Sequence, residues 1–82
     1  MSILHLDIVV VFYVDERDFV AKNIKLMIKS SGKNQAQVAR EMAMTEANIS
    51  DYVNGRAVPT IFTLKKLCQI LDCTYEDILG PL

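Results

Sequence analysis

A series of helix starts and stops between residues 18 and 80 constrains the fold more than any other feature of this 82-residue chain. Four polar residues that can cap a helix N-terminus each precede a stretch with apolar residues at helical spacing: Asn34, Thr45, Thr60 and Thr74. Glycines at positions 32, 55 and 80 supply stop signals. Helices this short are unstable alone in water, so they must be held by mutual packing. The pattern predicts an all-α, compact five-helix bundle.

The first helix is expected to follow Asp18 as its N-cap and to run to about Ser30. The last is a turn that ends at Leu79, with a start resembling a capping box at Thr74 and Asp77. The turns between helices are short, which is typical of a helix-turn-helix. The residues expected to face inward are Ile24, Met27, Ile28, Val38, Ala39, Met42, Ile49, Tyr52, Val53, Leu64, Leu67, Cys68 and Leu71.

Residues 3–14 follow a different pattern, in which apolar side chains alternate along the chain as in a half-buried strand. The sequence holds no second strand-like segment, so this strand would leave its backbone groups unpaired. We therefore expect it to pair with another copy of the chain, with residues 1–19 as a strand extension and residues 20–82 as the helical domain. The predicted dimer-interface residues are Leu4, Leu6, Ile8, Val10, Phe12 and Val14. Two alternatives are packing on the chain's own helices, and an extension foreign to a module that begins near Val20.

The charge is distributed unevenly along the chain. The net charge of -1 and the pI of about 5.7 argue weakly against a nucleic-acid partner. Residues 20–66, however, hold eight basic and three acidic residues, a net charge of +5, while residues 1–19 and 67–82 each carry -3. Local charge matters most when a surface meets phosphates, because the Debye length is about 8 Å at physiological salt. Ordinary solvated lysines are the alternative.

Several other classes of protein and site are not expected. The apolar run of residues 8–14 is too short to cross a membrane, and the first basic residue, Arg17, comes too late for a secretory signal, so we expect a cytoplasmic protein. Cys68 and Cys73 are expected to be reduced core residues, although they could in principle bridge. The lone histidine, His5, lacks the spacing of a metal site, and no cofactor or small-molecule ligand is expected.

The stretch of residues 34–59 resembles the phage-repressor-like (Cro/CI, or XRE) helix-turn-helix family. The resemblance extends over residues 24–79, about two thirds of the chain. The matching positions are Gln35 at the start of the second helix, Ala39 one turn later, Ile49 and Ser50 in the third, Asn54 and Gly55 after it, and Pro59 before the fourth. Where the family often pairs an Arg with a Glu, this chain has Ile28 and Val53, an apolar pair that can pack in the core without a buried charge.

The resemblance implies that the third helix lies in the major groove and that the second crosses the DNA backbone. The residues that the resemblance implies for base contacts are Glu46, Ala47, Asn48 and Asp51. The residues that it implies for contacts with the DNA backbone are Lys33, Asn34, Gln35, Thr45, Asn54, Arg56 and Lys65. A carboxylate in the groove can accept from cytosine, but it also repels phosphates. Glu46 as a helix-capping acid, and Asp51 and Lys65 as solvated charges, are the alternatives.

The resemblance implies a sequence-specific transcriptional regulator, expected to be a bacterial or prophage repressor, that binds double-stranded DNA as a homodimer on a pseudo-palindromic operator. A second hypothesis is a protein-interaction module of the same fold, similar to an antitoxin, with weak or no DNA binding. Salt dependence separates the two, because phosphate-driven binding falls steeply with ionic strength. An enzyme is not expected, since the sequence has no nucleophile beside a base and no phosphate-cradling glycine loop.

Overall fold

The computed structural model describes residues 18–80, and every regular element within that range is a helix. The first helix covers residues 18–30. It is followed by α2 (Gln35–Met42), α3 (Glu46–Val53), α4 (Ile61–Leu71) and α5 (Tyr75–Leu79). For the described residues this confirms the predicted all-α bundle of five helices. The predicted strand of residues 3–14, with its six dimer-interface side chains, lies outside the described residues.

The predicted N-caps set the helix starts. The Asn34 side chain accepts a hydrogen bond from the Gln37 N–H at 2.8 Å, and the Thr45 hydroxyl accepts one from the Asn48 N–H at 3.2 Å. Thr60 caps α4 in the same way, and Thr74 and Asp77 form a complete capping box on α5. Each cap satisfies a backbone donor that the first turn leaves unpaired.

Asp18, the fifth predicted N-cap, does not stand before its helix, because its own backbone is already helical. The predicted position of this N-cap is therefore wrong by at least one residue, since the cap must precede Asp18. An acidic side chain is favoured both at the cap and within the first turn, where it meets the positive end of the helix dipole. The residue type alone therefore does not distinguish the two positions.

The C-terminal ends of the helices are harder to predict from the sequence than their N-caps. Gly32 has φ +76° and ends the first helix as expected. Two other ends use residues for which this conformation is uncommon: Ala43 after α2 has φ 56°, and Asp72 after α4 has φ 53°. Their N–H groups bond back to carbonyl oxygens of the preceding helix, which closes its last turn. Neither residue is a glycine, so no stop signal marked these positions.

Five side chains are almost completely removed from solvent: Ile24, Ile49, Leu67, Ile78 and Val38. They come from all five helices, so each element contributes to one core. The apolar pair Ile28 and Val53 is buried in this core, as the sequence predicts. Met27 and Tyr52, also expected to face inward, are only partly buried at its margin. Val20, Ala21 and Ile78 are buried although their spacing did not single them out.

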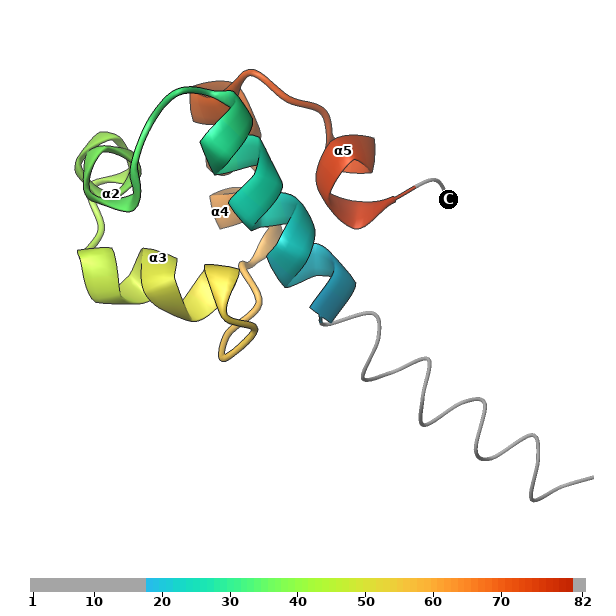
Figure 1. Ribbon diagram of the computed structural model, residues 1–82, viewed down its shortest axis with the longest axis horizontal. Helices are drawn as coiled ribbons and strands as arrows, with labels where there is room; N and C mark the ends of the chain where they lie inside the picture. Colours follow the sequence, from blue (N-terminus) through green and yellow to red (C-terminus); the bar gives the residue numbers. More distant parts are fainter. Residues whose placement is uncertain (1–17, 81–82) are drawn as a thin grey trace, which may run out of the picture.

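The helices are arranged so that α2 and α3 lie on one side of the first helix and α5 lies on the other (Figure 1). Helix α2 packs directly against α3. Three side-chain hydrogen bonds link distant parts of the described chain, among them one from Lys33 to a carbonyl of α4. The Asn23 amide donates to the Ile78 carbonyl at 3.0 Å and ties the first helix to α5. The Lys66 ammonium donates to the Met42 carbonyl at 3.2 Å and ties α4 to the end of α2. The α2–α3 pair is therefore attached to α4 through the end of α2.

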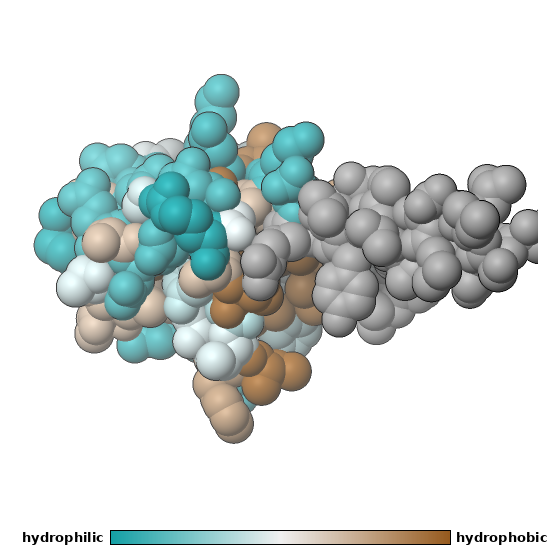
Figure 2. All heavy atoms as spheres, turned by 90° about the horizontal axis from the view of Figure 1, so that it is seen from below, coloured by the Kyte–Doolittle hydropathy of each residue, from teal (hydrophilic) through white to brown (hydrophobic). Residues whose placement is uncertain are grey.

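Polar and apolar side chains are separated on the surface. Figure 2 shows hydrophilic side chains covering one end of the visible face, while apolar side chains gather toward the other end. The most exposed large apolar residues are Ile61 and Phe62, at the start of α4. Within residues 18–80, no helix is long and apolar enough to cross a membrane, and no cluster of three metal-ligating side chains occurs.

Candidate nucleic-acid interface

The N-terminal turn of α3 presents three exposed side chains in a row: Glu46, Ala47 and Asn48. Within residues 18–80, none of these side chains forms a hydrogen bond to another part of the protein. The opposite face of the helix is fixed, because Ile49 is 1% exposed and Val53 is also buried. Helix α3 thus holds a rigid backbone against the core while its first turn offers free polar and methyl groups to solvent.

The fourth predicted base-contact residue, Asp51, is bound to Arg56. The Arg56 Nε donates to the Asp51 Oδ1 at 2.8 Å, and the Arg56 backbone N–H donates to the Asp51 carbonyl at 2.9 Å. The guanidinium also donates from Nη2 to the Ser50 hydroxyl at 3.2 Å. The carboxylate at this position is therefore neutralised locally by an arginine from the loop after α3. This weakens the repulsion of phosphates that the sequence alone implied.

Arg56 keeps free N–H donors although its guanidinium is bonded to Asp51 and Ser50. A guanidinium has five N–H donors in a planar fork, and Asp51 and Ser50 use two of them. The others remain for a phosphate, and Asp51 Oδ2 remains as an acceptor. One residue pair can therefore present a donor group and an acceptor group at the same place.

Asn54 differs from Arg56 because its donors are already used. Its amide nitrogen donates to the Ser50 carbonyl at 2.8 Å and lies 3.2 Å from the Ser50 hydroxyl. An amide has only two N–H donors, and its oxygen can only accept. The Asn54 side chain has no free donor for a phosphate oxygen in this conformation. Its role in the structure is to close the last turn of α3.

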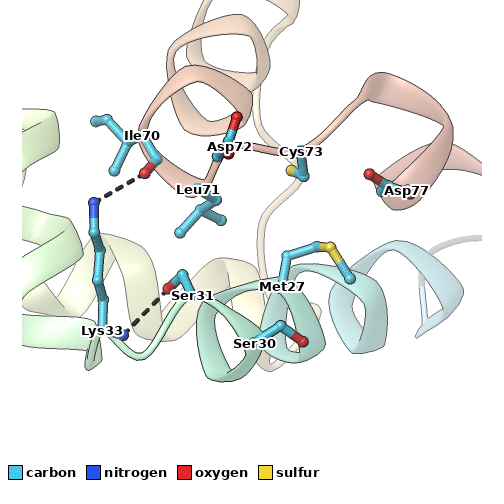
Figure 3. Close-up of a pocket in the computed structure, with 9 residues that line it drawn as sticks. All are labelled: Met27, Ser30, Ser31, Lys33, Ile70, Leu71, Asp72, Cys73 and Asp77. Carbon is cyan, nitrogen blue, oxygen red and sulfur yellow. Dashed lines mark hydrogen bonds between the residues drawn. The ribbon is translucent and has the colours of Figure 1, made fainter.

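Lys33 is likewise held within the protein. Its ammonium donates to the Glu41 carboxylate at 2.8 Å and to the Ile70 carbonyl at 2.9 Å, and its backbone N–H donates to the Ser31 hydroxyl at 3.2 Å. Figure 3 shows the Lys33 side chain reaching toward the end of α4. The hydrogen bond from Lys33 is the main cause that lowers the pKa of Glu41. Two of the three ammonium donors are committed, so the residue joins α2, α4 and the end of the first helix.

The remaining predicted backbone contacts keep free donors. Asn34 and Thr45 use only a side-chain oxygen for capping, which leaves the Asn34 amide N–H groups and the Thr45 hydroxyl hydrogen available. The side chains of Gln35, at the first turn of α2, and of the exposed Lys65 on α4 form no hydrogen bond within residues 18–80. The α2 N-terminus also carries unpaired backbone N–H groups and a positive dipole end, which together favour an anion.

Sequence reasoning missed the part played by Ser50. Its hydroxyl meets both Asn54 and Arg56, and its carbonyl accepts from Asn54. Ser50 and Asn54 are four residues apart, a spacing that places side chains on the same face of a helix. This signal could have indicated the cluster, although the approach of Arg56 depends on how the loop turns after α3.

A concave region lies between the first helix and the end of α4, with a volume of about 490 Å³ (Figure 3). It is lined in part by Lys33, whose ammonium is already bonded, and by Cys73. Burial is the main cause that raises the pKa of the Cys73 thiol to about 12, and burial also raises the pKa of Cys68. Both cysteines are free thiols, and a raised pKa keeps a thiol protonated and poorly nucleophilic at neutral pH.

Comparison with known proteins defines the class. The family model of the Cro/C1-type HTH DNA-binding domain matches residues 23–81, a range that contains α2 to α5 and most of the first helix. The chain belongs to this family, and the resemblance drawn from residues 34–59 is confirmed. It is also similar to an uncharacterized HTH-type transcriptional regulator, y4dJ, of Sinorhizobium fredii, with 26% identity over 68 residues, 83% of this chain and 88% of that protein. No solved structure matches the chain.

Proposed function

We propose that this protein is a sequence-specific DNA-binding transcriptional regulator that represses its targets as a homodimer on a pseudo-palindromic operator. The observation that carries the proposal is the first turn of α3, where exposed polar and methyl groups project from a helix whose other face is locked in the core. A rigid helix with unbonded side chains at its N-terminal end suits insertion into the major groove. Family membership, and a relative that is named as a transcriptional regulator, support the DNA-binding and regulatory part of the proposal.

We assign base reading to Glu46, Ala47, Asn48 and Asp51. The Asn48 amide can donate to and accept from adenine, and the Ala47 methyl can pack on a thymine methyl. Asp51 can accept from cytosine N4 through the oxygen that Arg56 leaves free. Glu46 lies at the dipole-positive end of α3, so capping remains the alternative explanation for its charge.

Backbone binding is assigned to the residues that keep free donors: Asn34, Gln35, Thr45, Arg56 and Lys65. Asn54 and Lys33 were expected in this set on sequence grounds. Their donors are used within the protein, so we give them supporting roles at the end of α3 and at the α2–α4 junction. Backbone contacts position the protein on the duplex, and base contacts supply the sequence preference.

The homodimer proposal rests on operator geometry and on the alternating apolar residues 3–14. Two recognition helices related by a two-fold axis read half-sites about 34 Å apart. Antiparallel pairing of two such segments would satisfy their backbone groups. Deletion of residues 1–14 is expected to give a folded monomer, and light scattering measures the change. A deletion variant that remains dimeric would rule out this dimer element.

The first experiment is selection of bound sequences from a random duplex library at two salt concentrations, with the oligomeric state checked by light scattering. A dimeric regulator should enrich a pseudo-palindrome and lose affinity as salt rises. A dimer that enriches no sequence, even at low salt, would contradict the proposal. That result would favour a protein-interaction module of the same fold, whose binding responds little to salt.

A further inference from the structure

Three apolar side chains stand out from the surface directly after α3. Val58 is 51% exposed, Ile61 is 72% exposed and Phe62 is 83% exposed. We call these three residues the Val58–Phe62 surface. No charged residue occurs between positions 57 and 64, although the domain around it is rich in lysine and arginine. A patch that is apolar and lacks charge has the composition of the buried centre of an interface.

The start of the described chain lies close to this surface. A Cβ atom on Gly55 would be 3.7 Å from the Asp18 carboxylate and 3.7 Å from the Ala21 side chain. The N-terminal end of the first helix therefore packs against the turn that follows α3. Val58 comes only three residues after Gly55, so it lies within about 11 Å of that contact, because a residue spans at most about 3.6 Å. Residues before Asp18 are thus joined to the described part of the chain at a point within reach of Val58.

The sequence of the tethered segment complements this surface in two ways. Residues 3–14 carry apolar side chains at every even position, and Val14 is only four residues from Asp18. The first 19 residues have a net charge of -3, with Asp15 and Glu16 next to the tether. The Val58–Phe62 surface is flanked in sequence by Arg56 and Lys65, both of which are exposed. Apolar positions can thus meet the surface while acidic residues meet its basic margins.

We propose that the Val58–Phe62 surface is a docking site for the same chain's N-terminal segment, residues 3–14, which covers it with the even-numbered apolar side chains. A short tether gives this segment an effective concentration in the millimolar range, so few contacts suffice for docking. Packing uses side chains, so the backbone of the segment stays available for pairing with a second copy. The inference does not depend on DNA binding, and its test needs no DNA.

The direct test is nuclear Overhauser spectroscopy on the full chain. Contacts are expected between the methyl groups of Val58 and Ile61 and the side chains of Val10, Phe12 and Val14. A one-to-one mixture of isotope-labelled and unlabelled chains separates contacts within a chain from contacts between chains. Contacts seen only between chains would overturn the proposal in favour of the segment of a second copy. The absence of any such contact would overturn it outright.

A charge substitution gives an independent test. Phe62→Lys should abolish the nuclear Overhauser contacts of Val58 and Ile61 with residues 3–14, while helical circular dichroism stays unchanged because Phe62 lies outside the core. Leu26→Lys and Leu79→Lys are matched controls, since both leucines are exposed apolar residues on other elements. Both controls should keep these contacts. Unchanged contacts in Phe62→Lys, or an equal loss in Leu79→Lys, would show that the segment does not dock here.

Discussion

The two ends of α3 are built differently, although both belong to an eight-residue helix. At the N-terminal end, Glu46, Ala47 and Asn48 project without side-chain hydrogen bonds to the rest of residues 18–80. At the C-terminal end, Ser50, Asp51, Asn54 and Arg56 form one hydrogen-bonded cluster. The first end can adapt to a ligand, whereas the second is ordered in advance. One short helix thus combines an N-terminal end with unbonded side chains and a C-terminal end that is preorganised.

Arg56 and Lys33 sharpen this difference, since the sequence nominated both for phosphate contacts. Arg56 pairs with Asp51 on the surface and keeps free donors in its fork. Lys33 is partly buried, and its ammonium donates to the Glu41 carboxylate and to the Ile70 carbonyl on α4. Two residues of equal charge therefore differ in their free donors: Arg56 keeps some for a ligand, and Lys33 uses most of its own within the fold. Substitutions at the two ends of α3, at its core anchor and at Lys33 can test this division.

Ile49→Ala should remove the support that both ends of α3 share. Ile49 is 1% exposed, and truncation of such a core residue costs about 2–5 kcal/mol of the free energy of unfolding because a cavity remains. Urea denaturation followed by circular dichroism measures this loss. Leu26→Ala is the control, since Leu26 is 52% exposed and its truncation should change stability by at most about 0.5 kcal/mol. Equal losses in both variants would mean that α3 is not anchored through Ile49.

Asn48→Ala should change the choice of base without changing the fold. The Asn48 side chain is exposed and makes no hydrogen bond within residues 18–80, so the free energy of unfolding should hardly move. Loss of a bidentate adenine contact costs about 1–3 kcal/mol of binding free energy on the selected operator. The cost should disappear on operators with another base at that position. A uniform loss on all operators would assign Asn48 to the DNA backbone.

The N-caps could be predicted from the sequence because a cap depends on residues three positions apart, as for Asn34 with Gln37 and Thr45 with Asn48. The internal role of Lys33 could not be predicted, since its partner carbonyl on Ile70 lies 37 residues further along the chain. The same limit applies to Ser50, which acquires its second partner only when the loop folds back. Local rules find the elements and nominate site residues, but tertiary contacts decide which donors stay free.

Arg56→Ala should weaken binding to every DNA sequence, because the proposed phosphate contact is lost and Asp51 loses its neutralising partner. The expected loss is about 1 kcal/mol at moderate salt, with a fall of about 1 in the slope of log affinity against log salt. Fluorescence anisotropy at several salt concentrations measures both quantities. Asp51→Ala combined with Arg56→Ala should recover part of the affinity for non-operator DNA, where Asp51 makes no base contact, since no unpaired carboxylate then faces the phosphates. No recovery would mean that the bridge does not act in binding.

Lys33→Ala is the matched control for Arg56→Ala, because it removes the same charge from the other region. It should leave the salt slope of DNA binding nearly unchanged, since most of its donors are committed within the protein. Its effect should be on stability instead, through the unsatisfied carbonyl of Ile70. A salt slope that falls as far as in Arg56→Ala would return Lys33 to the phosphate-contact set.

The smallest expected effect is a pH dependence that arises at Glu41. The hydrogen bond from Lys33 lowers the pKa of Glu41 in the folded protein below its ordinary value. A carboxylate with a lowered pKa contributes stability above its unfolded pKa, and that contribution is lost as pH falls through the folded pKa. Between about pH 7 and about pH 3, the unmodified protein should therefore lose slightly more stability than Glu41→Gln, whose amide does not titrate. Parallel denaturation curves at the two pH values measure the difference. Identical losses would show that the Lys33–Glu41 bond contributes no net free energy. Within residues 18–80, the Lys33 ammonium would then stabilise the fold through the carbonyl of Ile70 alone.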